Sequence, residues 1–141
     1  MKASDICVGD WLNIYTFPND NPKQDDLFPA KVSTVSIFDP SFDSDDVLVE
    51  VVIPNTNGVA SRPLDTCLPI ELTEEILVKN GFKKESQTID GDYCKYILPG
   101  FALNWCDTDG FWYQNGDIAP NHVHTLQHLL RLCNVQKEIE L

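Results

Sequence analysis

The first half of the chain contains short segments in which apolar and polar residues alternate or β-branched residues dominate. Both patterns are typical of β-strands. Four strands are predicted on this basis, over residues 11–15, 30–38, 47–53 and 59–68. The fourth contains Pro63, which has no backbone N–H to donate and therefore places this strand at the edge of a sheet. Loops rich in proline and aspartate are predicted over 17–29 and 39–46.

The second half opens with a helical pattern. Thr73 is a favourable N-cap, and the acidic Glu74 and Glu75 complement the positive end of a helix that runs to about residue 80. Gly81 suits the left-handed conformation that commonly follows a last helical turn. A three-stranded antiparallel meander is expected next, followed by an amphipathic helix. We place these elements at 93–98, 101–105, 111–114 and about 120–133.

Together these elements predict an α+β fold with a boundary near residue 70. Residues 1–70 are expected to form a small SH3-like β-barrel or a curled sheet, because they hold four short strands with irregular loops. The segment Val8-Gly9-Asp10-Trp11 resembles the turn that leads into the first strand of SH3-like barrels. Residues 71–141 are expected to form a helix, the three-stranded meander and a C-terminal helix across it. Two such subdomains can pack as one compact unit.

The composition is strongly acidic. Lys and Arg total 10 and Asp and Glu total 22 among 141 residues, so the formal net charge is −12. Binding to nucleic acid or to an anionic membrane draws much of its free energy from basic side chains, and the only adjacent basic pair is Lys83-Lys84. Direct nucleic-acid binding and membrane binding are therefore not expected. The charge fits a soluble protein, or one that binds a basic partner protein.

The cysteines indicate a reducing compartment. Their number, five, is odd, and they form no CxxC motif. The N-terminal residues contain no apolar signal region, and no run of 18 apolar residues predicts a membrane-spanning helix. We therefore expect reduced thiols and a cytoplasmic protein.

Two kinds of residue are weak candidates for metal ligands. His124 and His128 are one turn apart on the predicted last helix and could chelate a metal, but Arg131 lies on the same stripe and would repel a cation. The acidic loops 39–46 and 107–109 lack the spacing of a calcium-binding loop. No metal site and no cofactor are therefore expected.

Aromatic residues are concentrated in one part of the chain. Seven of the fourteen lie within residues 93–113, where they either fill the core or form a platform for a partner. Trp112 and Tyr113 are adjacent, so in a strand they face opposite sides, and at least one of them is expected to face away from the core. Trp112 and Tyr113, together with the acidic loop that contains Asp43, Asp45 and Asp46, are the candidate binding residues.

Three segments of the chain resemble small, acidic, uncharacterised proteins of prophages and mobile elements of gut bacteria. The residues that carry this resemblance are Lys2-Ala3, Asp5-Ile6, Gly9-Asp10-Trp11, Pro69-Ile70, Leu72-Thr73-Glu74-Glu75, Leu77, Gly81-Phe82, Val123-His124, Leu126-Gln127 and Leu129. The resemblance implies a genetic context and no activity. The position of His128 more often holds Asn in that group, which further weakens the metal candidate and leaves His124 and Gln127 as the matching polar residues.

No catalytic motif of the nucleophile, phosphate-loop or dinucleotide type is present. The leading interpretation is a non-enzymatic accessory protein that binds another protein and is encoded on a prophage or mobile element. An acidic inhibitor that mimics DNA is the first alternative, and it requires carboxylates in two rows. A metal-dependent hydrolase that uses His124, His128 and an aspartate is a less favoured alternative. The sequence leaves the oligomeric state open.

Overall fold

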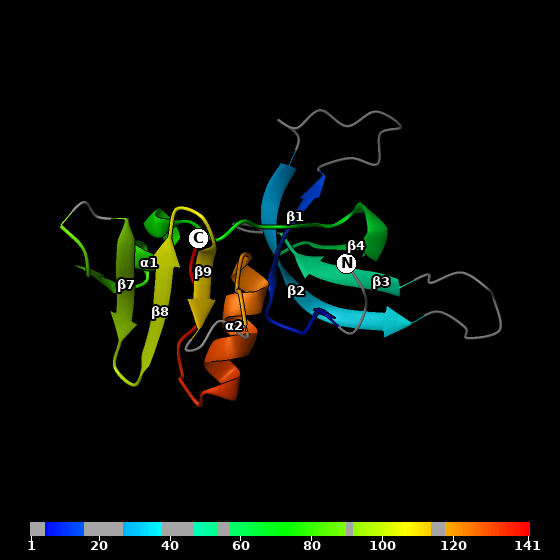
Figure 1. Cartoon of the computed structure of the whole chain (residues 1–141). Coiled ribbons are helices and arrows are strands. Elements are labelled where there is room, and N and C mark those ends of the chain that lie inside the picture. The colour runs from blue at the N-terminus through cyan, green and yellow to red at the C-terminus, as the bar shows by residue number, and fades with distance from the viewer. Residues whose placement is uncertain (1–4, 16–26, 38–46, 54–56, 90–91, 114–117) are drawn as a thin grey trace. The chain divides into compact units, whose positions relative to one another are not determined.

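The structure is a computed structural model, and it describes residues 5–15, 27–37, 47–53, 57–89, 92–113 and 118–141. The chain divides into two compact units, Met1–Ile70 and Glu71–Leu141. Each unit contains one antiparallel sheet (Figure 1). Strands and isolated bridges account for 48% of the described residues and helices for 19%. The predicted α+β class is therefore wrong, because the helices are short and the chain is mostly β.

The N-terminal unit is a five-stranded sheet with the strand order β4-β3-β2-β1-β5. Its elements are β1 (Trp11–Tyr15), β2 (Leu27–Ile37), β3 (Val47–Val52), β4 (Val59–Pro63), the 3-10 helix η3 (Leu64–Thr66) and β5 (Leu68–Pro69). The predicted barrel is wrong, since the described strands β4 and β5 are the two edges of the sheet and do not pair with each other. A barrel closes only when its edge strands pair, and β5 is two residues long and pairs with β1.

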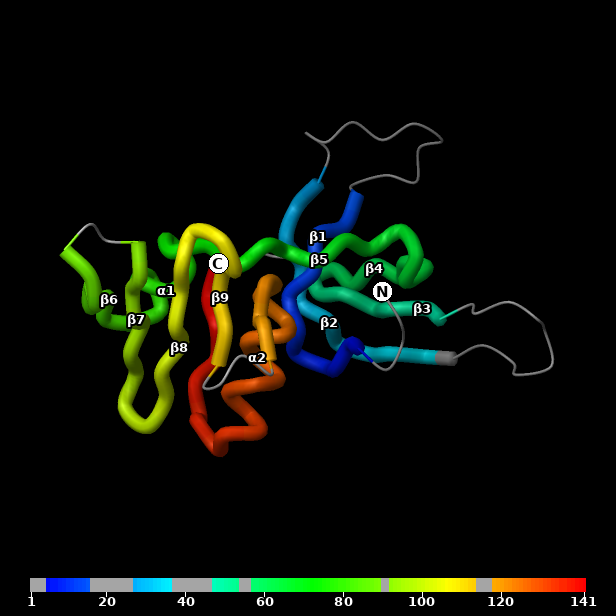
Figure 2. Tube along the Cα trace, viewed as in Figure 1, coloured from blue at the N-terminus to red at the C-terminus, as the bar shows by residue number. Residues whose placement is uncertain are grey.

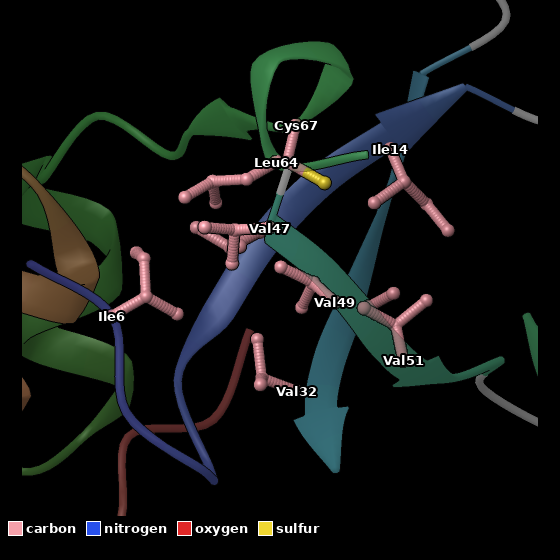
Figure 3. Packing of buried hydrophobic residues seen from close by; sticks show 10 residues of the cluster. Ile6, Ile14, Val32, Val47, Val49, Val51, Leu64 and Cys67 are labelled. Atoms are coloured by element: carbon pink, nitrogen blue, oxygen red, sulfur yellow. The ribbon is translucent and has the colours of Figure 1, made fainter. Parts of the chain in front are cut away.

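The core of this unit consists of side chains that point to one side of the sheet. Alternate residues of β1 and β3 are buried, in step with the two-residue repeat of a strand. Burial raises the pKa of the Cys67 thiol to about 11, so this thiol stays protonated and unreactive at neutral pH. Figure 3 shows core residues that point toward one another: Ile6, Ile14, Val32, Val47, Val49, Val51, Leu64 and Cys67.

Strand β2 is longer than predicted and contains a β-bulge. It begins at Leu27, inside the predicted loop 17–29, and includes Pro29, which pairs only with β1. The register with β3 shifts between Val32 and Thr34, so one extra residue is accommodated there. The bulge reverses the alternation beyond it, and as a result Val32 and Val35 both face the core.

Strand β4 forms an edge of the sheet, as Pro63 predicted. The backbone carbonyl of Ser61 accepts a hydrogen bond from Arg62 Nη1 (2.9 Å), and that of Pro63 accepts one from Thr66 Oγ1 (2.7 Å). Pro63 also lacks an N–H. Few hydrogen-bonding groups along this part of β4 are left for the strand of another molecule, which limits edge-to-edge association.

The C-terminal unit contains a four-stranded sheet with the order β6-β7-β8-β9 and two helices. Its elements are α1 (Glu74–Lys79), β6 (Lys83–Ser86), β7 (Tyr93–Leu98), β8 (Phe101–Cys106), β9 (Gly110–Tyr113) and α2 (Val123–Leu132). The predicted three-stranded meander is therefore incomplete. Strand β6 was missed because Lys83-Lys84-Glu85-Ser86 has no apolar alternation, and all four of its residues are exposed.

The predicted ends of α1 are confirmed. Thr73 Oγ1 accepts a hydrogen bond from the backbone N–H of Ile76 (3.3 Å). Gly81 adopts a positive φ of 84° and the N–H of Phe82 then donates to the carbonyl of Leu77 (3.0 Å). Helix α1 is thus closed at both ends by groups that the local sequence specifies.

The segment that follows α2 is fixed to α1 by one buried side chain. Asn80 Nδ2 donates to the carbonyls of Ile76 and Glu140, and Asn80 Oδ1 accepts the N–H of Glu140, each at 2.8 Å. Ile139, next to this contact, is 1% exposed. In Figure 2 the red C-terminal segment runs beside β9 on the far side of the sheet from the viewer. The last residues of the chain are therefore part of the core of this unit.

Candidate functional site

The two faces of the C-terminal sheet have different surroundings. Cys94, Tyr96, Leu103 and Phe111 point to one face and are buried. Helix α1 lies behind β7 and β8 in Figure 1, and none of the described elements of this unit lies in front of these strands. The residues between the buried ones must point to the front. We call this front surface the open face.

The open face is defined by the register of the four strands. Glu85 pairs with Lys95, Lys95 with Asn104, and Asn104 with Trp112, so these residues form one row across the sheet. The neighbouring rows add residues at two-residue intervals along each strand. The open face consists of Lys83, Glu85, Tyr93, Lys95, Ile97, Ala102, Asn104, Cys106, Gly110 and Trp112.

Two aromatic rings contact each other on the open face, Tyr93 at the start of β7 and Trp112 on the edge strand β9. The centroids of Tyr93 and Trp112 are 5.6 Å apart and their planes are tilted by 56°. Tyr93 Oη donates a hydrogen bond to Asn104 Oδ1 (3.0 Å). Asn104 lies between the two rings in the register and is 9% exposed. The hydrogen bond fixes the Tyr93 ring, and the ring contact fixes Trp112, so both are held before any ligand binds.

A depression lies at the end of the sheet near the β7–β8 turn. Its volume is about 480 Å³, and it is lined by Lys95, Ile97, Ala102 and Asn104 of the open face together with Leu98, Gly100, Phe101 and Tyr113. Volumes in this range are typical of sites for small ligands or short peptide segments. The open face thus offers apolar surface, from Ile97 and Ala102, between the side chains of Lys95 and Asn104.

Charge is distributed unevenly along the strands. Lys83 and Lys95 lie near the depression, where Lys83 pairs with Ile97. Asp107 and Asp109 lie in the exposed turn between β8 and β9, at the other end of the sheet. Although the whole chain carries a net charge of −12, the charged residue that lines the depression is the basic Lys95.

The covered face carries a polar cluster with a structural role. Both carboxylate oxygens of Glu74 accept hydrogen bonds from Lys84 Nζ (2.9 and 2.8 Å), and Tyr96 Oη donates to Glu74 Oε2 (2.9 Å). The bonds from Lys84 and Tyr96 hold the pKa of Glu74 below its ordinary value. Burial, and then the Glu74 bond, raises the pKa of Tyr96 to about 12. The side chains of Glu74, Lys84 and Tyr96 hydrogen-bond to one another, so their role is to hold α1 against the sheet.

The predicted binding residues do not form one surface. Trp112 lies on the open face, whereas Tyr113 lies on the covered face, where its ring stacks on Phe101 (5.2 Å) and its hydroxyl accepts a hydrogen bond from Cys133 Sγ (3.3 Å). The prediction that these two residues face opposite sides is confirmed. The candidate acidic residues Asp43, Asp45 and Asp46 lie outside the described residues.

Several residues of the open face were missed in the sequence. Lys95 and Asn104 have the same place in the two-residue repeat of their strands as Trp112 has in its own. That signal was present, but only the register shows that these residues are neighbours. Lys83 and Glu85 had no such signal, because β6 has no strand-like pattern.

The comparisons were negative. Family models, curated proteins and solved structures gave no match to the chain. No helix of the described residues has the length and apolar character needed to span a membrane. Any proposal on the function therefore rests on the residues of the chain alone.

The histidines form a cluster at the start of α2. The rings of His122 and His124 are stacked with centroids 5.6 Å apart, and the rings of His124 and His128 are 6.1 Å apart at nearly right angles. A structural or catalytic zinc needs at least three protein ligands. Within the described part of the C-terminal unit, no group of three histidine, cysteine or carboxylate ligands converges. The pair His124 and His128 therefore gains no third ligand from its own unit.

Proposed function

We propose that the chain is a non-enzymatic protein-binding module and that the open face is its contact surface. The observation that carries the proposal is the contact between the rings of Tyr93 and Trp112 on a face where no other described element of the unit lies in front of β7 and β8 in Figure 1. Trp and Tyr dominate the binding energy of many protein interfaces because they bury a large area with little loss of conformational freedom.

The shape of this surface supports a macromolecular partner. The face is a broad, twisted sheet surface with an open depression, and the described residues around Trp112 do not enclose a ligand. Partly buried rings fixed by neighbours are preorganised, and preorganisation lowers the entropic cost of association. We further propose that the module acts in the cytoplasm as an accessory protein of a prophage or mobile element, in line with the resemblance and the acidic composition.

The test is recovery of a partner from the native cell with three variants of the tagged protein. Trp112→Ala removes the larger of the two rings, and Ala102→Arg fills the depression without removing an aromatic side chain. Val78→Ala is the matched control, because Val78 is 52% exposed on α1, away from the open face. We expect wild type and the control to recover the same protein, and the two open-face variants to lose at least tenfold, which corresponds to about 1.4 kcal/mol.

Circular dichroism of each variant excludes loss of the fold as the cause. If Trp112→Ala and Ala102→Arg retain the fold and recover the partner as well as wild type does, the open face is not the contact surface. If no variant, wild type included, recovers a defined protein, the assignment as a protein-binding module is refuted.

A further inference from the structure

We infer that the partner contributes a segment in which a carboxylate lies next to an apolar side chain, with the carboxylate near Lys83 and Lys95 and the apolar group in the depression. This inference rests on the proposed function and names the chemistry of its partner. It departs from a basic partner, which the overall charge of the chain had suggested.

The first step concerns the position of the two lysines. Lys83 and Lys95 lie on adjacent antiparallel strands, since Lys83 pairs with Ile97 and Lys95 with Glu85. They are therefore diagonal neighbours on the same face, a geometry that brings long side chains within reach of one group. Lys84, between Lys83 and Glu85, points to the covered face and binds Glu74. Among the described residues of β6 and β7, the open face therefore presents the two lysines and one carboxylate, Glu85, so its charge there is net positive.

The second step concerns the apolar part of the depression. Ile97 and Ala102 face each other across β7 and β8, and together with Leu98, Phe101 and Tyr113 they give the depression apolar surface. An apolar side chain placed there removes apolar surface of both molecules from water, which stabilises the complex. Lys95 also lines the depression, so a carboxylate one or two residues from the apolar group reaches the lysines.

The third step reconciles this site with the acidic composition. A partner that is acidic throughout would be repelled by the net charge of −12. Asp107 and Asp109, at the far end of the strands, lie five or more residues along β8 from Ala102, or about 17 Å at 3.4 Å per residue. A partner with local acidic residues at the depression and basic residues beyond it is complementary to both ends of the face.

The experiment uses three synthetic peptides, each titrated into the full-length, 15N-labelled protein. Their central residues are Glu-Leu-Glu, Gln-Leu-Gln and Lys-Leu-Lys, in otherwise identical uncharged peptides. The NMR signals of the Trp112 indole N–H and of the Lys95 and Asn104 amides report on the open face. We expect the Glu-Leu-Glu peptide to bind about 3- to 10-fold more tightly than the Gln-Leu-Gln peptide, as expected for two exposed charge pairs, and the Lys-Leu-Lys peptide to bind least.

The matched variant is the double substitution Lys83→Glu and Lys95→Glu. Both side chains lie on the outer surface of the sheet, so the fold is expected to persist, and the order of the peptides should reverse. A purely structural role for the lysines would lower all three affinities together and would overturn the inference. The preference for Glu-Leu-Glu should also fall as the salt concentration rises.

The outcomes separate this inference from the proposed function. If the partner is lost with Trp112→Ala but the peptides show no charge preference, the surface binds a protein and the carboxylate chemistry is wrong. If no peptide shifts the open-face signals and no partner is recovered, both fail. A thymidine octanucleotide is titrated in parallel, and binding as tight as that of the Glu-Leu-Glu peptide would indicate a nucleic-acid ligand and refute a carboxylate-bearing segment.

Discussion

Asn80 illustrates how a single polar residue secures a terminus of the chain. It is 2% exposed, and its amide satisfies backbone groups of α1 and of the C-terminal segment with three hydrogen bonds. Buried polar groups of this kind stabilise a fold only when all their hydrogen bonds are made. A substitution that keeps the shape of the Asn80 side chain but removes its N–H donors therefore measures how much these hydrogen bonds contribute to the stability of the fold.

Asn80→Asp is expected to destabilise the protein by about 2–4 kcal/mol. The aspartate cannot donate to the carbonyls of Ile76 and Glu140, and it places a carboxylate against both of them. The measurement is urea unfolding followed by circular dichroism, with hydrogen exchange at the amide of Glu140 as a local readout. Lys137→Ala, at an exposed position of the same segment, serves as the control, and a loss for Asn80→Asp below about 0.5 kcal/mol would contradict this account.

The ion pair of Glu74 with Lys84 predicts a dependence of stability on pH. The pKa of Glu74 is lower in the folded protein than in the unfolded chain. Its contribution is therefore fully present above the unfolded value of about 4.3 and is lost as the pH falls through the folded value. Since both side chains are partly exposed, 48% for Glu74 and 38% for Lys84, the contribution is expected to be below about 1 kcal/mol.

The pair Glu74→Gln and Glu75→Gln tests this prediction. At pH 7 Glu74→Gln should be the less stable of the two, because only Glu74 accepts hydrogen bonds from Lys84 and Tyr96 among the contacts described above. Urea unfolding at pH 7, 4 and 3 should show the difference shrinking toward low pH. A difference that grows on acidification would mean that the sign of the pKa shift is wrong.

At the scale of elements, the bulge in β2 decides which residues face the core. The extra residue between Val32 and Thr34 is Ser33, whose Oγ donates to the carbonyl of Glu50 (3.0 Å). Removal of Ser33 would leave a regular strand in which Val32 and Val35 still point inward. Removal of Lys31 would instead bring Ala30 and Val32 next to each other, so one part of β2 must turn its core residues outward.

Two one-residue deletions are therefore expected to behave in opposite ways. The deletion of Ser33 should cost no more than about 2 kcal/mol, for one hydrogen bond and an altered bend. The deletion of Lys31 should abolish the fold of the N-terminal unit, because several buried side chains at about 1.5–3 kcal/mol each would be exposed. Circular dichroism and dispersion of the NMR signals of both proteins provide the comparison, and equal damage by the two deletions would exclude this reading of the bulge.

The elements that the sequence predicted well are those specified by neighbouring residues. Thr73 and Gly81 act on atoms within one or two turns of the helix ends that they form. Strand β6 was not predictable in this way, because it is held by backbone pairing with β7 while its own side chains are exposed. The class of the fold was wrong for a related reason, since short strands without apolar alternation were counted as loops.

The candidate site shows the same limit. That Trp112 and Tyr113 face opposite sides follows from the two-residue repeat alone, but which of them faces outward does not. Its contact with Tyr93 depends on the registers of β7 with β8 and of β8 with β9, and a register is set by the packing of whole strands. A single sequence does not specify which residues two strands apart will meet.

At the scale of the whole molecule, the net charge of −12 is the dominant property. Like charges repel one another in the folded protein and less so in the expanded, unfolded chain. We expect the thermal midpoint at pH 7 to rise by roughly 2–5 °C between 20 mM and 500 mM NaCl, since salt screens this repulsion.

The same salt series near pH 4.3 is the control, because the net charge is close to zero at the isoelectric point of about 4.3. There the midpoint should change little with salt, in a differential scanning calorimetry experiment at low protein concentration. Equal shifts at both values of pH would show that salt acts on something other than the net charge.

The border of the N-terminal sheet has a consequence for how the molecule behaves in a crowded cell. Electrostatic repulsion between two copies of the chain weakens as the salt concentration rises. The occupied carbonyls of Ser61 and Pro63 and the missing N–H of Pro63 do not depend on salt. A fibre grows when strands pair with an unpaired sheet edge, and this stretch of β4 offers few free hydrogen-bonding groups for such pairing. This stretch of β4 therefore limits the growth of a polymer from that edge at any salt concentration.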